Sequence, residues 1–182
     1  PPRSTPLYSS AASDVYKRQP NTVKKAVEVA IKMGVWMLNV HSLGGKEMLR
    51  AAYEVVEKVS IKPLLVGVTV LTSLNDKSLK EVGLGLNTED QVLLLAELCQ
   101  TEGLNGVVCS ANELSVLRKH LKEDFLLVTP GIRSSGQESD DQKRISTASE
   151  AISNGADYIV IGREISNEID PSEKIRQILE TV

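Results

Sequence analysis

The chain has 182 residues, of which 41% are hydrophobic, 25% are charged and only 3% are aromatic, and its formal net charge at pH 7 is −3. This length suits one domain with a sizeable core. Aromatic side chains are scarce, so Val, Leu and Ile must build that core, as they do in buried parallel strands. A mildly negative chain without a long basic run argues against nucleic acid as a partner. No apolar run reaches the roughly 18 residues of a membrane span, so we expect no membrane segment.

The two cysteines, Cys99 and Cys109, fall in an expected helix and an expected strand, and no CxxC or His/Cys cluster accompanies them. We therefore predict two buried thiols in a reducing cytoplasm and no metal site. The first residues lack the apolar stretch of a signal peptide, so no secretion signal is expected.

The first 19 residues differ from the rest because they are rich in Ser and Pro and have no sustained apolar period. We interpret residues 1–19 as a disordered or non-native leader. Residues 20–182 form the predicted domain, in which helical and strand patterns alternate. The predicted helices occupy residues 21–34, 46–59, 88–103, 112–121, 147–155 and 172–182. The predicted strands are apolar runs at residues 35–40, 64–71, 106–110, 125–129 and 157–161.

Strict alternation with short turns after glycine-ended helices implies a parallel α/β sheet with helical connections. Two architectures fit: an open doubly wound sheet, or the C-terminal part of a (β/α)8 TIM barrel. A complete barrel has eight units and about 250 residues. On the second interpretation, the chain holds about five of the eight βα units and the N-terminal strands are missing.

Functional residues should gather where the strands end, in either architecture. The fourth predicted strand leads into Gly131 and Arg133, and the fifth leads into Gly162 and Arg163. Glycine lets backbone N–H groups approach an anion, and arginine adds charge-assisted hydrogen bonds. Two such pairs at consecutive strand ends predict a phosphate site. The alternative is that both arginines form ordinary surface ion pairs.

Other strand-end residues allow both a functional and a structural interpretation. Thr72 and Ser73 could bond a polar ring or simply end a strand, and His41 is an acid or base candidate by position alone. The polar loop 133–145 could be a lid over the substrate or a solvated loop. His120 is expected to be solvated, and Glu164 could merely favour the start of a helix.

Several segments of the sequence together resemble bacterial orotidine 5′-phosphate decarboxylases, in matching order and spacing from about Pro20 to the C-terminus. The quoted segments are PNT (20–22), GVWMLNVHSLGG (34–45), VTVLTS (68–73), GVVCSA (106–111), LVTPGIR (127–133), DQKRI (141–145) and GADYIVIGREI (155–165). The LVTPGIR and DYIVIGR segments together are the most specific. Single segments also occur in sugar-phosphate decarboxylases and synthases of the same barrel superfamily.

This resemblance implies a homodimeric (β/α)8 barrel that makes UMP from orotidine 5′-phosphate without a metal or organic cofactor. It implies that Arg133, Gly162 and Arg163 hold the phosphate and that Gln142 closes over it. It further implies that Thr72 bonds the pyrimidine edge and that Thr22 lines the substrate site near the dimer interface.

The chain departs from the resembled family before Pro20, where the family has a strand-end motif Asp-x-Lys-x-x-Asp-Ile. Its lysine protonates the carbon that loses CO2. Here Val15 stands at the lysine position, and Ser13 and Arg18 stand at the flanking aspartate positions. We therefore predict a fragment that retains the remote phosphate grip and is catalytically inactive. A related phosphosugar lyase or synthase, or a non-catalytic phosphate-binding remnant, remains the alternative.

Overall fold

The computed structural model describes residues 19–133 and 144–182. Its strands are β1 (Met37–His41), β2 (Leu64–Val68), β3 (Gly106–Val108), β4 (Leu126–Thr129) and β5 (Tyr158–Ile159). Its α-helices are α1 (Pro20–Lys32), α2 (Lys46–Glu57), α3 (Asp76–Glu81), α4 (Thr88–Thr101), α5 (Leu114–His120), α6 (Ala148–Ser153), α7 (Arg163–Ser166) and α8 (Pro171–Leu179). Two short 3-10 helices, η2 (Ser42–Gly44) and η3 (Ala111–Glu113), follow β1 and β3.

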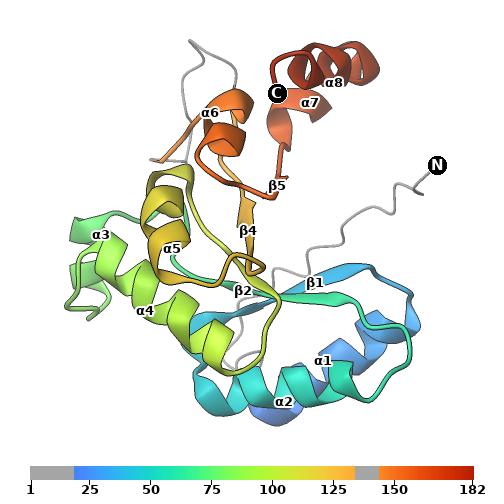
Figure 1. The fold of residues 1–182 in the computed structure, drawn as a ribbon, viewed down its shortest axis with the longest axis vertical. Helices are drawn as coiled ribbons and strands as arrows, with labels where there is room; N and C mark the ends of the chain where they lie inside the picture. Colours follow the sequence, from blue (N-terminus) through green and yellow to red (C-terminus); the bar gives the residue numbers. More distant parts are fainter. Residues whose placement is uncertain (1–18, 134–143) are drawn as a thin grey trace.

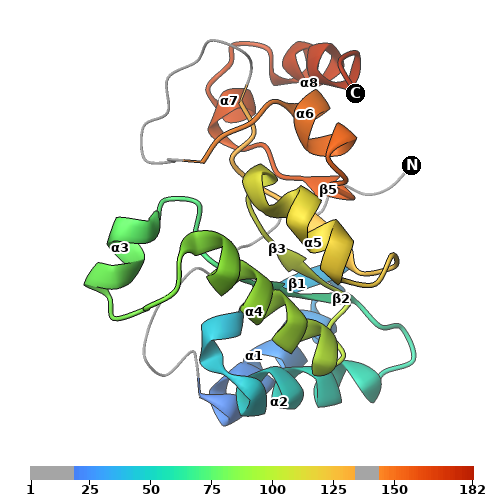
Figure 2. The same ribbon diagram turned by 60° about the vertical axis from the view of Figure 1, so that its left-hand side comes forward.

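The five strands form one parallel sheet in the order β1-β2-β3-β4-β5, which is also their order in the chain. A doubly wound sheet reverses its strand order at a switch point, whereas a barrel adds each strand beside the last. The sequential order therefore selects the partial barrel among the two predicted architectures. Helices α2, α4 and α5 lie along one side of the sheet, and α6, α7 and α8 gather at the end opposite α1 and α2 (Figures 1 and 2).

The sheet is curved, as a barrel wall requires. In a flat sheet β1 and β5 would lie about 19 Å apart, which is four strand spacings. The ring centroids of Trp36, just before β1, and Tyr158, in β5, are nevertheless 5.5 Å apart. Contact between side chains at the first and last strands requires the intervening strands to bend toward one another.

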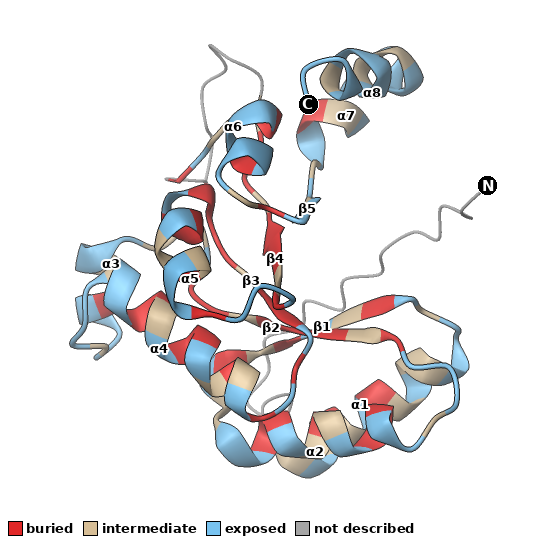
Figure 3. Ribbon diagram, viewed as in Figure 1, coloured by how far each residue is buried: buried red, intermediate tan, exposed pale blue. Residues whose placement is uncertain are grey.

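The two faces of the sheet bury different sets of side chains. The helix-covered face carries the main core, in which Leu65, Val107 and Leu127 are fully buried. The other face carries a small cluster centred on Val66 and Val128. Because side chains alternate along a strand, neighbouring residues contribute to opposite faces. Figure 3 shows the buried strands and the largely exposed α8, which has no buried residue.

The predicted helix starts and ends agree with the structure to within a few residues. Gly34 and Gly155 adopt positive φ values of 72° and 101°, a conformation that favours glycine after a helix. Asp170 caps α8 by accepting from the backbone N–H of Ser172 and Glu173. Helix α4 begins at Thr88 as predicted, and its cap is Asn87, whose side chain accepts from the N–H of Asp90.

All five strands are shorter than predicted, the second, third and fifth by two residues or more; helix α3 was not predicted, and the helix expected at Glu164 was given no bounds. The second predicted strand, 64–71, ends at Val68, because the carbonyls of Val70 and Leu71 accept from an arginine rather than from a neighbouring strand. The third stops at Val108, and the fifth covers only Tyr158–Ile159. Helices α3 and α7, with six and four residues, are too short to show an apolar period.

No helix within the described ranges, 19–133 and 144–182, is long and apolar enough to cross a membrane. The predictions that concern residues 1–18, including Val15, lie outside these ranges, as does the prediction that Gln142 closes over the phosphate.

Candidate functional site

The carboxyl ends of the five parallel strands meet at one edge of the sheet, and most of the predicted site residues follow them. Thr72 lies half-buried in the turn after β2, and Arg133 lies four residues after β4. Gly162 and Arg163 follow β5 and are exposed. Since Thr129 pairs with Ile159, the turns that carry Arg133 and Arg163 leave neighbouring strands at the same level.

Backbone hydrogen bonds hold Arg133 in place. Its N–H donates to the carbonyl of Ser146 at 2.9 Å, and the N–H of Ser146 donates to the carbonyl of Gly131 at 3.2 Å. This short parallel bridge between Ile132 and Ser146 fixes the chain on both sides of Ile132, at Gly131 and at the N–H of Arg133. Gly131 has a φ of 82°, which allows the chain to turn directly after β4. The arginine backbone is thus rigidly placed at the strand end.

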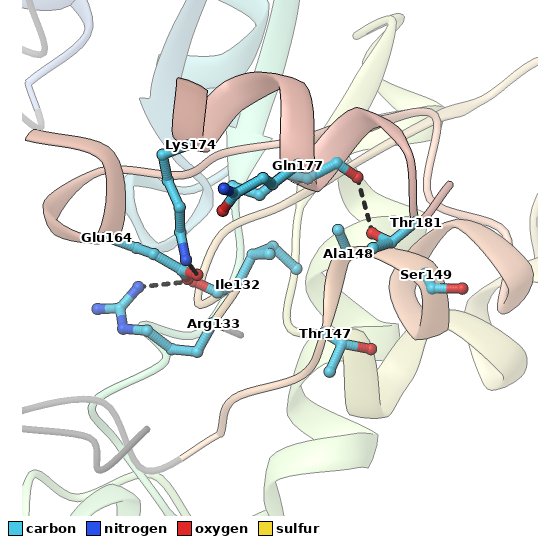
Figure 4. Close-up of a pocket in the computed structure, with 10 residues that line it drawn as sticks. Ile132, Arg133, Thr147, Ala148, Ser149, Glu164, Lys174, Gln177 and Thr181 are labelled. Carbon is cyan, nitrogen blue, oxygen red and sulfur yellow. Dashed lines mark hydrogen bonds and ion pairs between the residues drawn. The ribbon is translucent and has the colours of Figure 1, made fainter. Parts of the chain in front are cut away.

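A pocket of about 270 Å³ opens beside Arg133 (Figure 4). The pocket is lined by Ile132, Arg133, Thr147, Ala148, Ser149, Glu164, Lys174, Gln177, Ile178 and Thr181. Lys174 forms an ion pair with the buried carboxylate of Glu164 at 3.1 Å. Two cationic side chains and three hydroxyls around one carboxylate make a polar wall that can hold an anionic or hydroxylated group.

Glu164 and Lys174 were not predicted as members of this wall. The sequence interpretation left Glu164 as a residue that merely starts a helix. It does lie in the first turn of α7, yet it is buried and paired with Lys174 from α8. An ion pair between two helices leaves no local sequence pattern, which is why this partner was missed.

The position of Gly162 leaves room for a ligand. A Cβ atom added at this residue would meet no atom within 4 Å. The backbone beside Arg163 is therefore accessible from outside, as close approach of an anion to backbone N–H groups requires. Arg163 itself lies outside the set of residues that line the pocket beside Arg133.

A second open pocket of about 410 Å³ lies near the ends of β2 and β3. It is lined by Asp76, Asn87, Thr88, Glu89, Asn112, Glu113 and Arg144. Glu113 is buried and forms an ion pair with Arg144. Burial raises the pKa of Glu113, and the Arg144 guanidinium opposes that rise. Arg144 belongs to the DQKRI segment, and no role was predicted for it from the sequence.

Among the predicted site residues that the structure describes, Thr22 is the one that follows no strand of the sheet. Thr22 is half-buried in the first turn of α1, which packs mainly against α2, and it lines neither pocket. The two predicted buried thiols are confirmed, since Cys99 and Cys109 are both buried and free.

The two histidines lie apart from each other. His41 is half-buried at the end of β1 and has an interaction partner. His120 is exposed at the end of α5, with Nδ1 at 2.9 Å from the carbonyl of Val116. In the part of the chain that the structure describes, no three His, Cys, Asp or Glu side chains gather as a metal site would need.

Comparison with known proteins relates nearly the whole chain to one family. The model of the "Orotidine 5'-phosphate decarboxylase / HUMPS family" matches residues 19–178. An orotidine 5′-phosphate decarboxylase from Vibrio atlanticus is 51% identical over 160 residues, which cover 87% of this chain and 69% of that protein. One from Neisseria meningitidis serogroup A is 48% identical over 164 residues, covering 90% and 67%.

Solved structures agree with this relation. The crystal structure of orotidine 5′-phosphate decarboxylase from Lactobacillus acidophilus is similar to this chain with a TM-score of 0.75 and 34% identity. The match covers 89% of this chain and 70% of that structure. The chain thus spans about two thirds of the length of its relatives.

Proposed function

Because this chain belongs to the orotidine 5′-phosphate decarboxylase / HUMPS family, we propose that it binds orotidine 5′-phosphate and its product UMP at the carboxyl ends of its strands. The family function is decarboxylation of orotidine 5′-phosphate to UMP in pyrimidine biosynthesis. The phosphosugar alternative is less favoured, because relatives about half identical to this chain carry the decarboxylase name.

The observation that carries the proposal is the placement of Arg133 and Arg163 after neighbouring strands. Arg133 is fixed by the bridge to Ser146, and the backbone at Gly162 is open. We assign the 5′-phosphate to Arg133, Gly162 and Arg163, since backbone N–H groups and guanidinium groups suit a dianion. Thr72, in the turn after β2, bonds the pyrimidine edge in this proposal.

Two further residues and the quaternary state belong to the same proposal. Gln142 closes over the phosphate, and Thr22 lines the site near the interface of a homodimer. Residues 20–182 form the family's domain and residues 1–19 a foreign leader, and the family match starts at residue 19. We also propose a cytoplasmic location, which suits two buried free thiols. No cofactor is needed in this proposal.

Binding and turnover are separate questions for this chain. Decarboxylation leaves a carbanion, whose formation depends on charges placed at the reacting carbon. Binding of the remote phosphate helps by positioning the substrate and driving closure. With Val15 at the proton-donor position, we propose that the chain keeps the phosphate grip and does not turn over substrate.

Titration of the 182-residue chain with UMP tests the grip. Arg163→Ala and Arg133→Ala each remove charge-assisted hydrogen bonds worth about 1.5–3 kcal/mol, so the dissociation constant should rise about 10- to 150-fold. Arg176→Ala is the matched control, because Arg176 is an exposed arginine on α8 paired with Glu173. Its affinity for UMP should stay within about twofold of that of the unmodified chain.

Unchanged UMP affinity in Arg163→Ala would remove the phosphate site from the proposal. A decarboxylation assay with orotidine 5′-phosphate addresses the second part. Turnover close to that of a full-length relative would contradict the assignment of Val15 to the proton-donor position, while UMP binding without turnover is the expected result.

A further inference from the structure

Arg144 is a buried charge that the proposed function does not use. It is 8% exposed, and its guanidinium makes three hydrogen bonds to residues that the structure describes. Nη2 donates to the carbonyls of Val70 at 3.1 Å and Leu71 at 3.0 Å. Nη1 donates to Oε1 of Glu113. The other Glu113 oxygen accepts from the backbone N–H of Ser110 at 2.9 Å.

These partners belong to two different strand ends. Val70 and Leu71 directly precede Thr72 in the turn after β2. Ser110 and Glu113 form the capping box of η3, directly after β3. The guanidinium therefore ties the Thr72 turn to the end of β3, over a separation of 31 to 74 residues in the chain.

The backbone of Arg144 connects to a third strand end. Arg144 lies two residues before Ser146, which pairs with the chain on both sides of Ile132 through Gly131 and Arg133. Arg144 thus links the two turns: its side chain contacts the Thr72 turn, and its backbone leads directly into the Ser146 pairing with the Arg133 turn. We call this set of contacts, made by Arg144 with Val70, Leu71 and Glu113, the Arg144 bridge.

Stability alone is a weak reason for this arrangement. Removing a guanidinium and a carboxylate from water is costly, and apolar side chains of similar size often stabilise a fold equally well. What the charged pair adds is direction, since the planar guanidinium donates along fixed lines to several acceptors at once. The bridge therefore fixes the geometry between the two turns.

We propose that Arg144 is a positioning residue that holds the Thr72 turn at a set distance from the Arg133 turn, so that one nucleotide can contact both. This inference rests on the proposed function, in which Thr72 bonds the base and Arg133 the phosphate. Loss of the bridge leaves each half of the site intact but uncouples them. The base then adds little to the affinity that the phosphate provides.

The test compares two ligands, UMP and ribose 5-phosphate, which shares the sugar and phosphate but has no base. Arg144→Lys keeps a positive charge beside Glu113 but cannot donate along three fixed lines. The preference for UMP over ribose 5-phosphate should fall about fivefold to tenfold, the size of a lost neutral hydrogen bond. The affinity for ribose 5-phosphate itself should change less than about twofold, because the Arg133 turn is untouched.

Arg118→Lys is the matched control. Arg118 is also a partly buried arginine that donates to backbone carbonyls, those of Gly155 and Phe125. These carbonyls precede β5 and β4, so they lie at the amino ends of the strands, away from the proposed site. This variant should lose stability without changing the preference for UMP. A double variant with Thr72→Ala completes the set: once Thr72 is gone, Arg144→Lys should cause no further loss of UMP affinity.

Equal loss of affinity for both ligands in Arg144→Lys, or an unchanged preference, overturns the inference. Hydrogen exchange without ligand separates this result from failure of the proposed function. In Arg144→Lys the amide of Leu74, in the Thr72 turn, should exchange about tenfold faster, while the amides of Arg133 and of α1 should not change. If the unmodified chain binds neither ligand, the proposed function fails, and the exchange rate of Leu74 alone decides whether the Arg144 bridge holds the Thr72 turn in place.

Discussion

At the scale of single residues, the two cysteines illustrate how burial controls chemistry. Cys99 is buried and lies 3.0 Å from the hydroxyl of Ser42, and burial raises the pKa of its thiol to about 11. Burial also raises the pKa of Cys109. The thiolate is the reactive form of a cysteine. With a pKa of about 11, only about one part in a thousand of the Cys99 thiol is ionised at pH 8.

We therefore predict that neither thiol reacts with a colorimetric thiol reagent at pH 8 while the chain is folded. Both should react when the chain is unfolded in guanidinium chloride. The measurement is the number of thiols titrated per chain before and after denaturation. Rapid reaction of either thiol in the native chain would mean that the packing around β3 and α4 opens readily.

The residue scale also shows the limits of local patterns. Arg133 and Arg163 could be selected from the sequence because each follows a strand and a glycine. Arg144 follows a polar stretch and could not be singled out from the sequence in the same way. The burial of Arg144 depends on its contacts with Val70, Leu71 and Glu113. No residue near Arg144 in the chain indicates those contacts.

At the scale of elements, a single carboxylate joins the starts of α3 and α4. Oδ1 of Asp76 accepts from the backbone N–H of Thr88 at 2.8 Å and from its hydroxyl at 2.5 Å. These bonds lower the pKa of Asp76, the hydroxyl bond being the larger cause. A carboxylate whose pKa is lower in the folded state stabilises the fold above its unfolded pKa, and this contribution is lost as pH falls through the folded value.

The prediction is that Asp76→Asn removes part of the acid sensitivity of the fold. The stability difference between the unmodified chain and Asp76→Asn should be fully present at about pH 6 and should shrink as the pH falls below the ordinary aspartate pKa of about 4. Urea denaturation at a series of pH values measures it. Thr88→Val, which lacks the hydroxyl donor, should reduce the same pH dependence. A constant difference across the series would mean that Asp76 acts by shape and not by charge.

At the scale of the whole molecule, both borders of the sheet are open within residues 19–133 and 144–182. In this part of the chain β1 pairs only with β2, and β5 only with β4. Unpaired strand edges invite pairing with another chain, especially where apolar side chains are exposed. Tyr158 in β5 and Ile61 before β2 are both exposed, the second almost completely, at 90%.

We predict concentration-dependent self-association through the strand edges, which sedimentation velocity measures. Tyr158→Lys puts a charge on the β5 edge and should shift the distribution toward the monomer, since lysine protects edge strands. Ile61→Lys is the control, because it removes a more exposed apolar side chain that lies on neither edge. Equal effects of the two variants would point to general apolar adhesion instead of edge pairing.

The sequence by itself determined the αβ alternation, the approximate positions of the five strands, and the choice of Arg133 and Arg163 as candidates for holding a phosphate. Each of these depends on short-range physics: apolar period, glycine after a helix, and the residues that directly follow a strand. The sequence left open whether the sheet was doubly wound or part of a barrel, because both share the same local pattern.

Only the tertiary structure decided that question, through the sequential strand order and the curvature that brings Trp36 to Tyr158. It also decided which charges are buried together, as with Glu164 and Lys174 and with Glu113 and Arg144. The reason is physical: a buried ion pair is selected by the distance between groups after folding. That distance depends on the packing of the whole sheet and not on the spacing of residues along the chain.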